Sequence, residues 1–222
     1  MNLLTEQDIR RIIKKNLMET TLIGDTSDPL IDSIVDRVIG HEGKEEKMYK
    51  DTKGIPTIGV GFNLKRKDSD ELLKQVGANP RRIKSGREKL NDKQIKRLLR
   101  HTLAESKNDA KLLVKNFDTL PENVQGVLIE MVFNLGKYGL SKFKNFLNYI
   151  QNKQWVKASK EMLNSAWAKQ VGNRSKTLSD IIKSTVTSDP NFMNRNIDVY
   201  MGKQFDKNTG LKIEKPTFKM DI

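Results

Sequence analysis

The chain has 222 residues, with no cysteine and only two histidines, so hydrolytic chemistry in it rests mainly on carboxylates. The lack of cysteine excludes disulfides, iron–sulfur clusters, thiolate metal sites and a cysteine nucleophile, and two histidines disfavour a histidine-rich zinc site or a Ser-His-Asp triad. The formal net charge is +13, and residues 32–186 carry the whole excess. Such a field favours a polyanionic partner, namely nucleic acid, an anionic membrane surface or an acidic cell-wall polymer.

The first 29 residues are predicted to stand apart from the main domain. Residues 5–17 have the apolar spacing of a short amphipathic helix that Thr5 caps, and residues 20–28 form a polar linker. Charged side chains interrupt the apolar start, so we expect no signal peptide. No stretch approaches the roughly 18 apolar residues of a membrane span. We interpret residues 1–29 as a docking segment.

The first core helix has clear start and stop signals. Asp28 is placed to cap it, Pro29 suits its first turn, and the apolar pattern ends at Gly43. The next stretch predicts two short strands over residues 48–52 and 56–61, joined by a turn at Lys53 and Gly54. Gly59 and Gly61 alternate on one face, where a ligand or another backbone has room to approach.

The rest of the main domain is predicted to be helical. Asn91 caps a long helix over residues 92–114, and Pro121 opens a core helix. Further helical patterns cover residues 140–151, 153–164 and 172–185, while residues 187–222 suit a small hairpin or an extended arm. The fold class is therefore α+β but mainly α, with one small hairpin near the start of a helical domain that spans residues 30–186.

Two carboxyl groups in unlike surroundings frame the hairpin. We expect partial burial and the negative end of the helix dipole to favour the protonated form of Glu42, as a general acid requires. Asp51, at the edge of the turn, is expected to be wetter and ionised. Such a pair is typical of glycoside hydrolysis. The alternative is that Glu42 is an ordinary helix-end residue and Asp51 an ordinary turn aspartate.

The local sequence resembles the catalytic segment of the T-even phage lysozymes, glycoside hydrolase family 24. That family has Glu, eight residues, Asp, five residues, Thr, and Glu42, Asp51 and Thr57 match this spacing. The similarity continues downstream in the family's order and covers about residues 30–186. The matching downstream segments are residues 131–136, 154–155, 165–167 and 173–174.

The resemblance implies a two-lobe fold in which the helix over residues 92–114 joins a small hairpin lobe to a helical lobe. It implies cleavage of the β-1,4 bond between N-acetylmuramic acid and N-acetylglucosamine in peptidoglycan, with no metal or organic cofactor. Glu42 would protonate the leaving oxygen, Asp51 would stabilise the developing positive charge, and Thr57 would hold the attacking water. Because the family inverts, the two carboxyls are expected about 6.5–9.5 Å apart.

The resemblance also assigns residues around the reacting bond, with some departures. Arg174 would pair with Glu42 and orient it, and Trp167 would support the site. Substrate contacts are expected at Asn63, Phe133, Asn134 and Phe146. Asn134 stands where the family has glutamine, Phe146 where it has serine, and Phe62 where it has a structural histidine.

Some side chains have plainer interpretations. Trp155 is expected in the core, and His41 is expected to be an exposed helix-end residue. A packed helix face is favoured over an aromatic cage for one further group, which comprises Phe143, Phe146, Tyr149 and Ile150.

The sequence thus predicts a phage-type lysozyme, or muramidase, whose partner is peptidoglycan. One expectation is an endolysin that accumulates in the host cytoplasm and reaches the periplasm after holin-dependent release. The alternative is a virion-associated enzyme, docked on a phage tail or other virion protein through residues 1–29 or 187–222. Two further classes are a structural virion protein with a lysozyme fold and a nucleic-acid-binding protein. Intact Glu42, Asp51 and Thr57 argue against the first, and scattered basic residues argue against the second.

Overall fold

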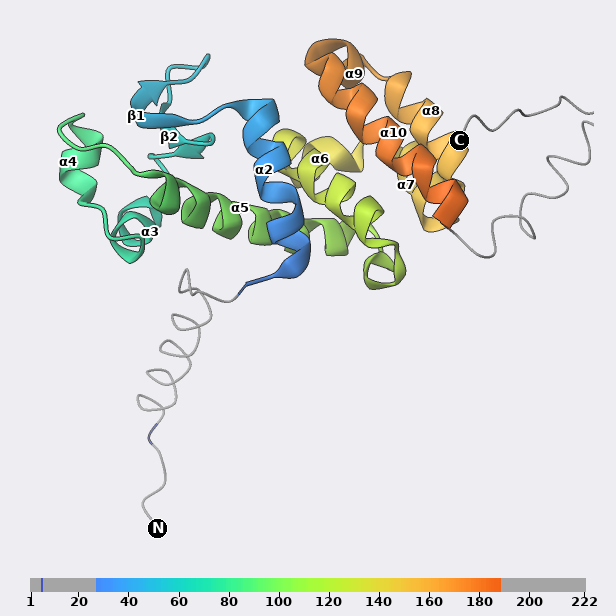
Figure 1. Cartoon of the computed structure of the whole chain (residues 1–222), viewed down its shortest axis with the longest axis horizontal. Coiled ribbons are helices and arrows are strands. Elements are labelled where there is room, and N and C mark those ends of the chain that lie inside the picture. The colour runs from blue at the N-terminus through green and yellow to red at the C-terminus, as the bar shows by residue number, and fades with distance from the viewer. Residues whose placement is uncertain (1–4, 6–26, 189–222) are drawn as a thin grey trace, which may run out of the picture. The chain divides into compact units, whose positions relative to one another are not determined.

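The computed structural model describes residue 5 and residues 27–188, and its contacts divide the chain into two compact units (Figure 1). The first unit ends at Lys153 and the second begins at Gln154. Two predicted elements lie outside the described residues. One is the amphipathic helix over residues 5–17, of which only Thr5 is described, and the other is the hairpin or arm within residues 187–222.

Helix α2 (Pro29–Glu42) confirms the first predicted core helix. The Asp28 carboxylate accepts hydrogen bonds from the backbone N–H groups of Leu30 at 3.1 Å and Ile31 at 3.3 Å. These bonds satisfy two of the donors that a helix start leaves without partners. The helix stops at Gly43, whose φ of 75° is a conformation that glycine adopts without a steric penalty. Its buried stripe comprises Leu30, Ile31, Ile34, Val35 and Val38.

A three-stranded antiparallel sheet follows, in the order β1 (Glu45–Lys50), β2 (Pro56–Gly59) and β3 (Phe62–Asn63). The prediction of two strands was wrong in two respects. β1 begins at Glu45 because its charged start pairs through the backbone, with Glu45 opposite Gly59. The second predicted strand is a hairpin, since Gly59 and Gly61 both have positive φ (65° and 71°) and turn the chain back into β3.

Further helices complete the first unit. They are α3 (Ser69–Gln75), α4 (Pro80–Lys84), α5 (Asp92–Leu113), α6 (Glu122–Ser141) and α7 (Lys144–Gln151), with a 3-10 turn at Phe117–Thr119. Of these, α4 and α5 contact the sheet, and α5 and α6 contact α2. The predicted cap of α5 is confirmed, because the Asn91 and Gln94 side chains each accept from the other's backbone N–H. The long helix α5 contacts α2, α6 and the sheet (Figure 1). It therefore connects the strands to the core helices of the first unit.

The second unit consists of α8 (Trp155–Leu163), α9 (Ala166–Val171) and α10 (Asn173–Ser188), with α10 packed on both others. Trp155 is 1% exposed, which confirms its predicted place in the core. The short α9 was not predicted, although Ser165 caps it by accepting from the Ala168 N–H at 3.0 Å. No helix among the described residues combines the length and the apolar character that a membrane crossing needs.

Helices α2 and α6 approach closely at Gly126. A Cβ atom at Gly126 would lie 2.9 Å from Ile34 Cγ2 and 3.4 Å from an Arg37 Nη2 atom. Contacts below 3 Å are not tolerated without movement, and the β-branched Ile34 has little rotamer freedom in a helix. The missing side chain at Gly126 therefore sets the distance between the two helices.

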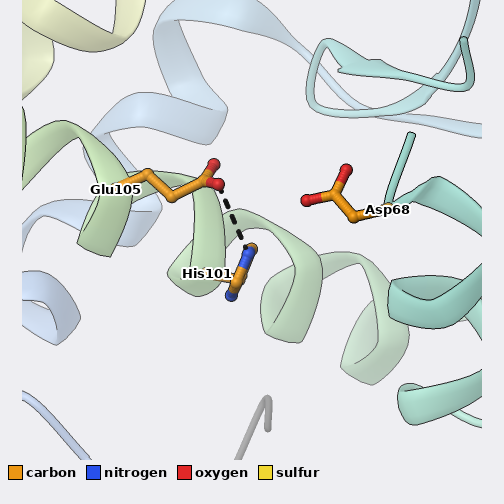
Figure 2. A group of neighbouring side chains, drawn as sticks. All are labelled: Asp68, His101 and Glu105. Carbon is orange, nitrogen blue, oxygen red and sulfur yellow. Dashed lines mark ion pairs between the residues drawn. The ribbon is translucent and has the colours of Figure 1, made fainter. Parts of the chain in front are cut away.

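An ion-pair network anchors the segment after the sheet to α5. Arg66 Nη2 lies 2.7 Å from Asp68 Oδ2 and 2.6 Å from Glu105 Oε1. Figure 2 shows Asp68 facing His101 and Glu105 of α5, with His101 Nε2 lying 3.6 Å from Glu105 Oε1. Burial alone raises the pKa of Glu105, but hydrogen bonds from Arg66 and His101 outweigh it and lower the pKa to about 2. The hydrogen bond from Arg66 likewise lowers the pKa of Asp68.

We predict that Gly126→Ala destabilises the protein by about 1–2 kcal/mol, because the clash with Ile34 exceeds the gain in helix propensity. Gly40→Ala is the matched control, since a Cβ at this exposed position in α2 meets no atom within 4 Å. That variant should be neutral or up to about 1 kcal/mol more stable. Urea unfolding measures both. Equal stability of the two variants would contradict the close approach of α2 and α6.

We predict that Arg66→Gln lowers the free energy of unfolding by about 1–2 kcal/mol near neutral pH, a figure discounted for solvent screening of the half-exposed carboxylates. Because the folded-state pKa of Glu105 is depressed from 4.5 to about 2, this stabilisation is present above pH 4.5 and is lost as the pH falls toward 2. Wild type and variant should therefore converge in acid.

Urea midpoints measured across this pH range test the network. Lys65→Gln removes the same charge from the neighbouring exposed position, and it should shift stability by less than about 0.5 kcal/mol. A difference between wild type and Arg66→Gln that is constant with pH would show that the two carboxylates do not contribute through their charge.

Candidate functional site

Glu42 is the last residue of α2, where the chain leaves the helix for the sheet. Its side chain is exposed, so the expectation of partial burial was wrong. Because α2 ends at this residue, no further turn of the helix covers it. Asn134 of α6 donates a hydrogen bond from Nδ2 to Glu42 Oε1 at 3.4 Å. The structure thus brings together two residues that were predicted for the site from positions 92 apart in the chain.

Asp51 shapes the turn between β1 and β2. Its Oδ1 accepts from the backbone N–H groups of Lys53 and Ile55, each at 2.8 Å. No described residue donates to Oδ2. Asp51 is therefore a turn aspartate, as one interpretation held, and it also keeps one carboxylate oxygen for another partner.

Thr57 lies on the central strand, opposite Tyr49 of β1 and Asn63 of β3. Residues directly opposite in antiparallel strands share a face of the sheet, so these three side chains form one row. Thr57 is 4% exposed, and its hydroxyl donates to the Ile55 carbonyl at 2.9 Å. The hydroxyl oxygen keeps its acceptor capacity for a water molecule.

Tyr49, which faces Thr57 across the sheet, lies in an acidic environment. Burial raises the pKa of Tyr49, and the negative charges of Glu45, Asp51 and Glu42 raise it further. Both predicted catalytic carboxyls thus act electrostatically on the same phenol.

The remaining predicted residues fall into three groups. Phe133 adjoins Asn134 on α6 and is partly exposed. Phe146 is fully buried in α7, so the packed helix face is correct and the side chain is not available to a sugar. Trp167 of α9 and Arg174 of α10 belong to the second unit and are buried. Pairing of Arg174 with Glu42 stays a prediction.

Sequence reasoning missed a buried ion cluster next to Glu42. Glu130 of α6 is 0% exposed, and its Oε1 accepts from Arg37 Nε of α2 at 2.5 Å. Its Oε2 lies 3.4 Å from His41 Nδ1. His41 was expected to be an exposed helix-end residue, but only 17% of its side chain is accessible because it turns toward Glu130. The available signal was an acidic residue inside the apolar run of a predicted core helix.

Among the described residues, one group has three possible metal ligands close together, namely Asp68, His101 and Glu105 (Figure 2). Arg66 already bridges the two carboxylates with one guanidinium nitrogen. A metal ion would have to displace this permanently charged group. We therefore assign the cluster to the ion-pair network and not to a metal centre.

Comparison with known proteins agrees with the fold. The family described as "Phage lysozyme" matches residues 39–181. "Probable T4-type lysozyme 1" of Dictyostelium discoideum is 30% identical over 166 residues, which cover 70% of this chain and 96% of that protein. "Probable T4-type lysozyme 2" of the same organism is 28% identical over 163 residues, with the same coverage.

A third relative is a component of a virus particle. The "Pre-baseplate central spike protein Gp5" of Enterobacteria phage T4 is 29% identical over 151 residues, covering 64% of this chain and 26% of that protein. The family match spans more than half of the chain and includes Glu42, Asp51 and Thr57. The chain therefore belongs to the phage lysozyme family of glycoside hydrolases.

Proposed function

We propose that the chain is a lysozyme that hydrolyses the β-1,4 bond between N-acetylmuramic acid and N-acetylglucosamine in peptidoglycan. The observation that carries this proposal is the phage lysozyme family match over the segment that holds Glu42, Asp51 and Thr57, with Asn134 hydrogen-bonded to Glu42. Two carboxyls of different environment on one site are what acid-assisted glycoside hydrolysis requires.

The local geometry supports a distinct role for each residue. Glu42, exposed and held from one side by Asn134, is placed to donate a proton to the leaving oxygen. Asp51 has one oxygen fixed by two backbone N–H groups, so its orientation is set before substrate arrives. Its Oδ2 then stabilises the positive charge that develops on the sugar and helps to place a water molecule. The Thr57 hydroxyl oxygen accepts a hydrogen bond from that water.

The proposed outcome at the anomeric carbon is inversion, in which water attacks from the face opposite the leaving group. Glu42 would act as the acid only, and no covalent sugar adduct would form. Support comes from the family resemblance and from Thr57, which offers an acceptor for water on the strand next to Asp51.

For the biological role, we propose an endolysin that acts on the wall from within after holin-dependent release. The two T4-type lysozymes support a free enzyme, because the match spans nearly their whole length. A second candidate is a virion-associated lysozyme, which the match to a phage spike protein favours. Mass spectrometry of purified virions separates the two, since the endolysin should be absent from particles and present in the lysate.

The proposed activity is tested by clearing of chloroform-treated Gram-negative cells. Wild type should clear the suspension, and Glu42→Gln should be slower by about 100-fold or more, because the amide cannot donate the proton. Glu122→Gln, at an exposed carboxylate in the first turn of α6, is the matched control and should clear at the wild-type rate. Clearing by Glu42→Gln at the wild-type rate would remove Glu42 from the mechanism.

A further inference from the structure

Glu130 is a buried carboxylate that the proposed mechanism does not use. It is 0% exposed in the middle of α6, among residues that are otherwise apolar. Removing a carboxylate from water costs several kcal/mol, and apolar side chains of equal volume often give a more stable core. Stability alone therefore gives no account of an acidic residue at this position.

The partners of Glu130 both come from the last turns of α2. Arg37 and His41 are four residues apart, so they project from one face of that helix. Within the described part of the chain, Glu130 Oε2 and His41 Nδ1 are buried and make no hydrogen bond, and they face each other at an ion-pair distance of 3.4 Å. If Nδ1 carried no proton, its lone pair would face the carboxylate oxygen, and the two would repel each other. We therefore expect a proton on Nδ1, because only that form makes the contact with Glu130 attractive and lets it orient the ring.

This cluster adjoins Glu42 on α2 and lies one helical turn from Asn134 on α6. On α2, His41 directly precedes Glu42. On α6, Glu130 is followed four residues later by Asn134, which donates to Glu42 Oε1. Gly126, four residues earlier, allows the close approach of α2. Three successive turns of α6 thus meet α2: Gly126 lies against the Ile34 and Arg37 side chains, Glu130 forms the ion cluster, and Asn134 contacts Glu42.

We propose that Glu130 is a positioning residue that locks the end of α2 through Arg37 and His41, and so holds Glu42 against Asn134. This inference rests on the proposed function of Glu42 as the general acid. Catalytic groups must be held within a fraction of an ångström of the productive geometry, and a misplacement of about 1 Å costs up to 100-fold in rate. A helix terminus frays readily, and the cluster ties this terminus down one turn before the acid.

The variant Glu130→Gln keeps the shape of the Glu130 side chain and removes its negative charge. The amide offers one acceptor and one donor in place of two acceptors. When its oxygen accepts from Arg37, its NH2 group faces His41 Nδ1, which must then present a lone pair. The proton of the neutral imidazole moves to Nε2, and Arg37 loses its counter-charge. The cluster keeps its volume and a neutral contact to each partner, but it loses the charge pairing with Arg37 that is proposed to hold the end of α2.

The first measurement is the tautomer of His41 by 15N NMR, recorded between about pH 6 and 10. The chain has only two histidines, so His101→Gln assigns the signals. The neutral form of His41 should carry its proton on Nδ1 in wild type and on Nε2 in Glu130→Gln. A wild-type His41 in the Nε2–H form would overturn the contact through which Glu130 is proposed to act.

The second measurement is steady-state kinetics on solubilised peptidoglycan, at a temperature where circular dichroism shows each variant fully folded. Glu130→Gln should lower kcat by about 10-fold or more and change KM by less than about twofold, because substrate contacts stay intact. Val124→Ala is the control for lost stability. It creates a cavity at a fully buried position at the other end of α6 from Asn134, and both of its kinetic constants should stay within about twofold of wild type.

The outcomes separate this inference from the proposed function. A wild type that cleaves no peptidoglycan overturns the proposed function, while the tautomer still decides whether Glu130 holds His41. A cleaving wild type with an equally active Glu130→Gln overturns the positioning role alone, as does an equal kcat loss in Val124→Ala. If Glu130→Gln does not fold, the Arg37→Gln/Glu130→Gln double variant removes both charges. Full activity of that double variant would also overturn the proposal.

Discussion

The close crossing of α2 and α6 is the constraint on which the rest of the site depends. A glycine in α6 leaves room for Ile34 and Arg37 of α2, and this spacing brings Glu130 within reach of Arg37 and His41. The same register puts Asn134 beside Glu42 one turn later. Since α2 is capped firmly by Asp28 at its start and stops at Gly43, its terminal carboxyl is presented at a fixed point, where the chain enters the sheet.

Helix and sheet contribute to the site in different ways. The helix end supplies an exposed carboxyl that contacts Asn134, which suits the proposed role of Glu42 as a proton donor. The hairpin supplies a carboxylate whose orientation is fixed by two backbone N–H groups, and it also supplies the buried hydroxyl of Thr57. The proposed roles of these two groups, acting on developing charge and on water, need rigidity. The net charge of +13 suits a substrate embedded in an anionic wall.

Much of this organisation could be predicted from the sequence, because it rests on local signals. The caps at Asp28 and Asn91 and the Glu, Asp and Thr spacing depend on neighbouring residues alone, and the structure confirms both helices they begin. β3 is two residues long and α9 only six, so neither has enough periodicity to be recognised. The Glu130 cluster joins residues 93 positions apart. Burial of Glu42 was misjudged because it depends on what packs beyond the last turn of α2, which helical periodicity does not report.

The most direct test of the account is the chemical nature of the ends that the enzyme creates. Purified peptidoglycan is digested, reduced with borohydride and examined by mass spectrometry. The account predicts that the new reducing ends are on N-acetylmuramic acid, that they appear as the reduced sugar, and that Glu42→Gln produces almost none. New ends on N-acetylglucosamine, released amino acids in place of sugar ends, or equal yields from wild type and Glu42→Gln would contradict it.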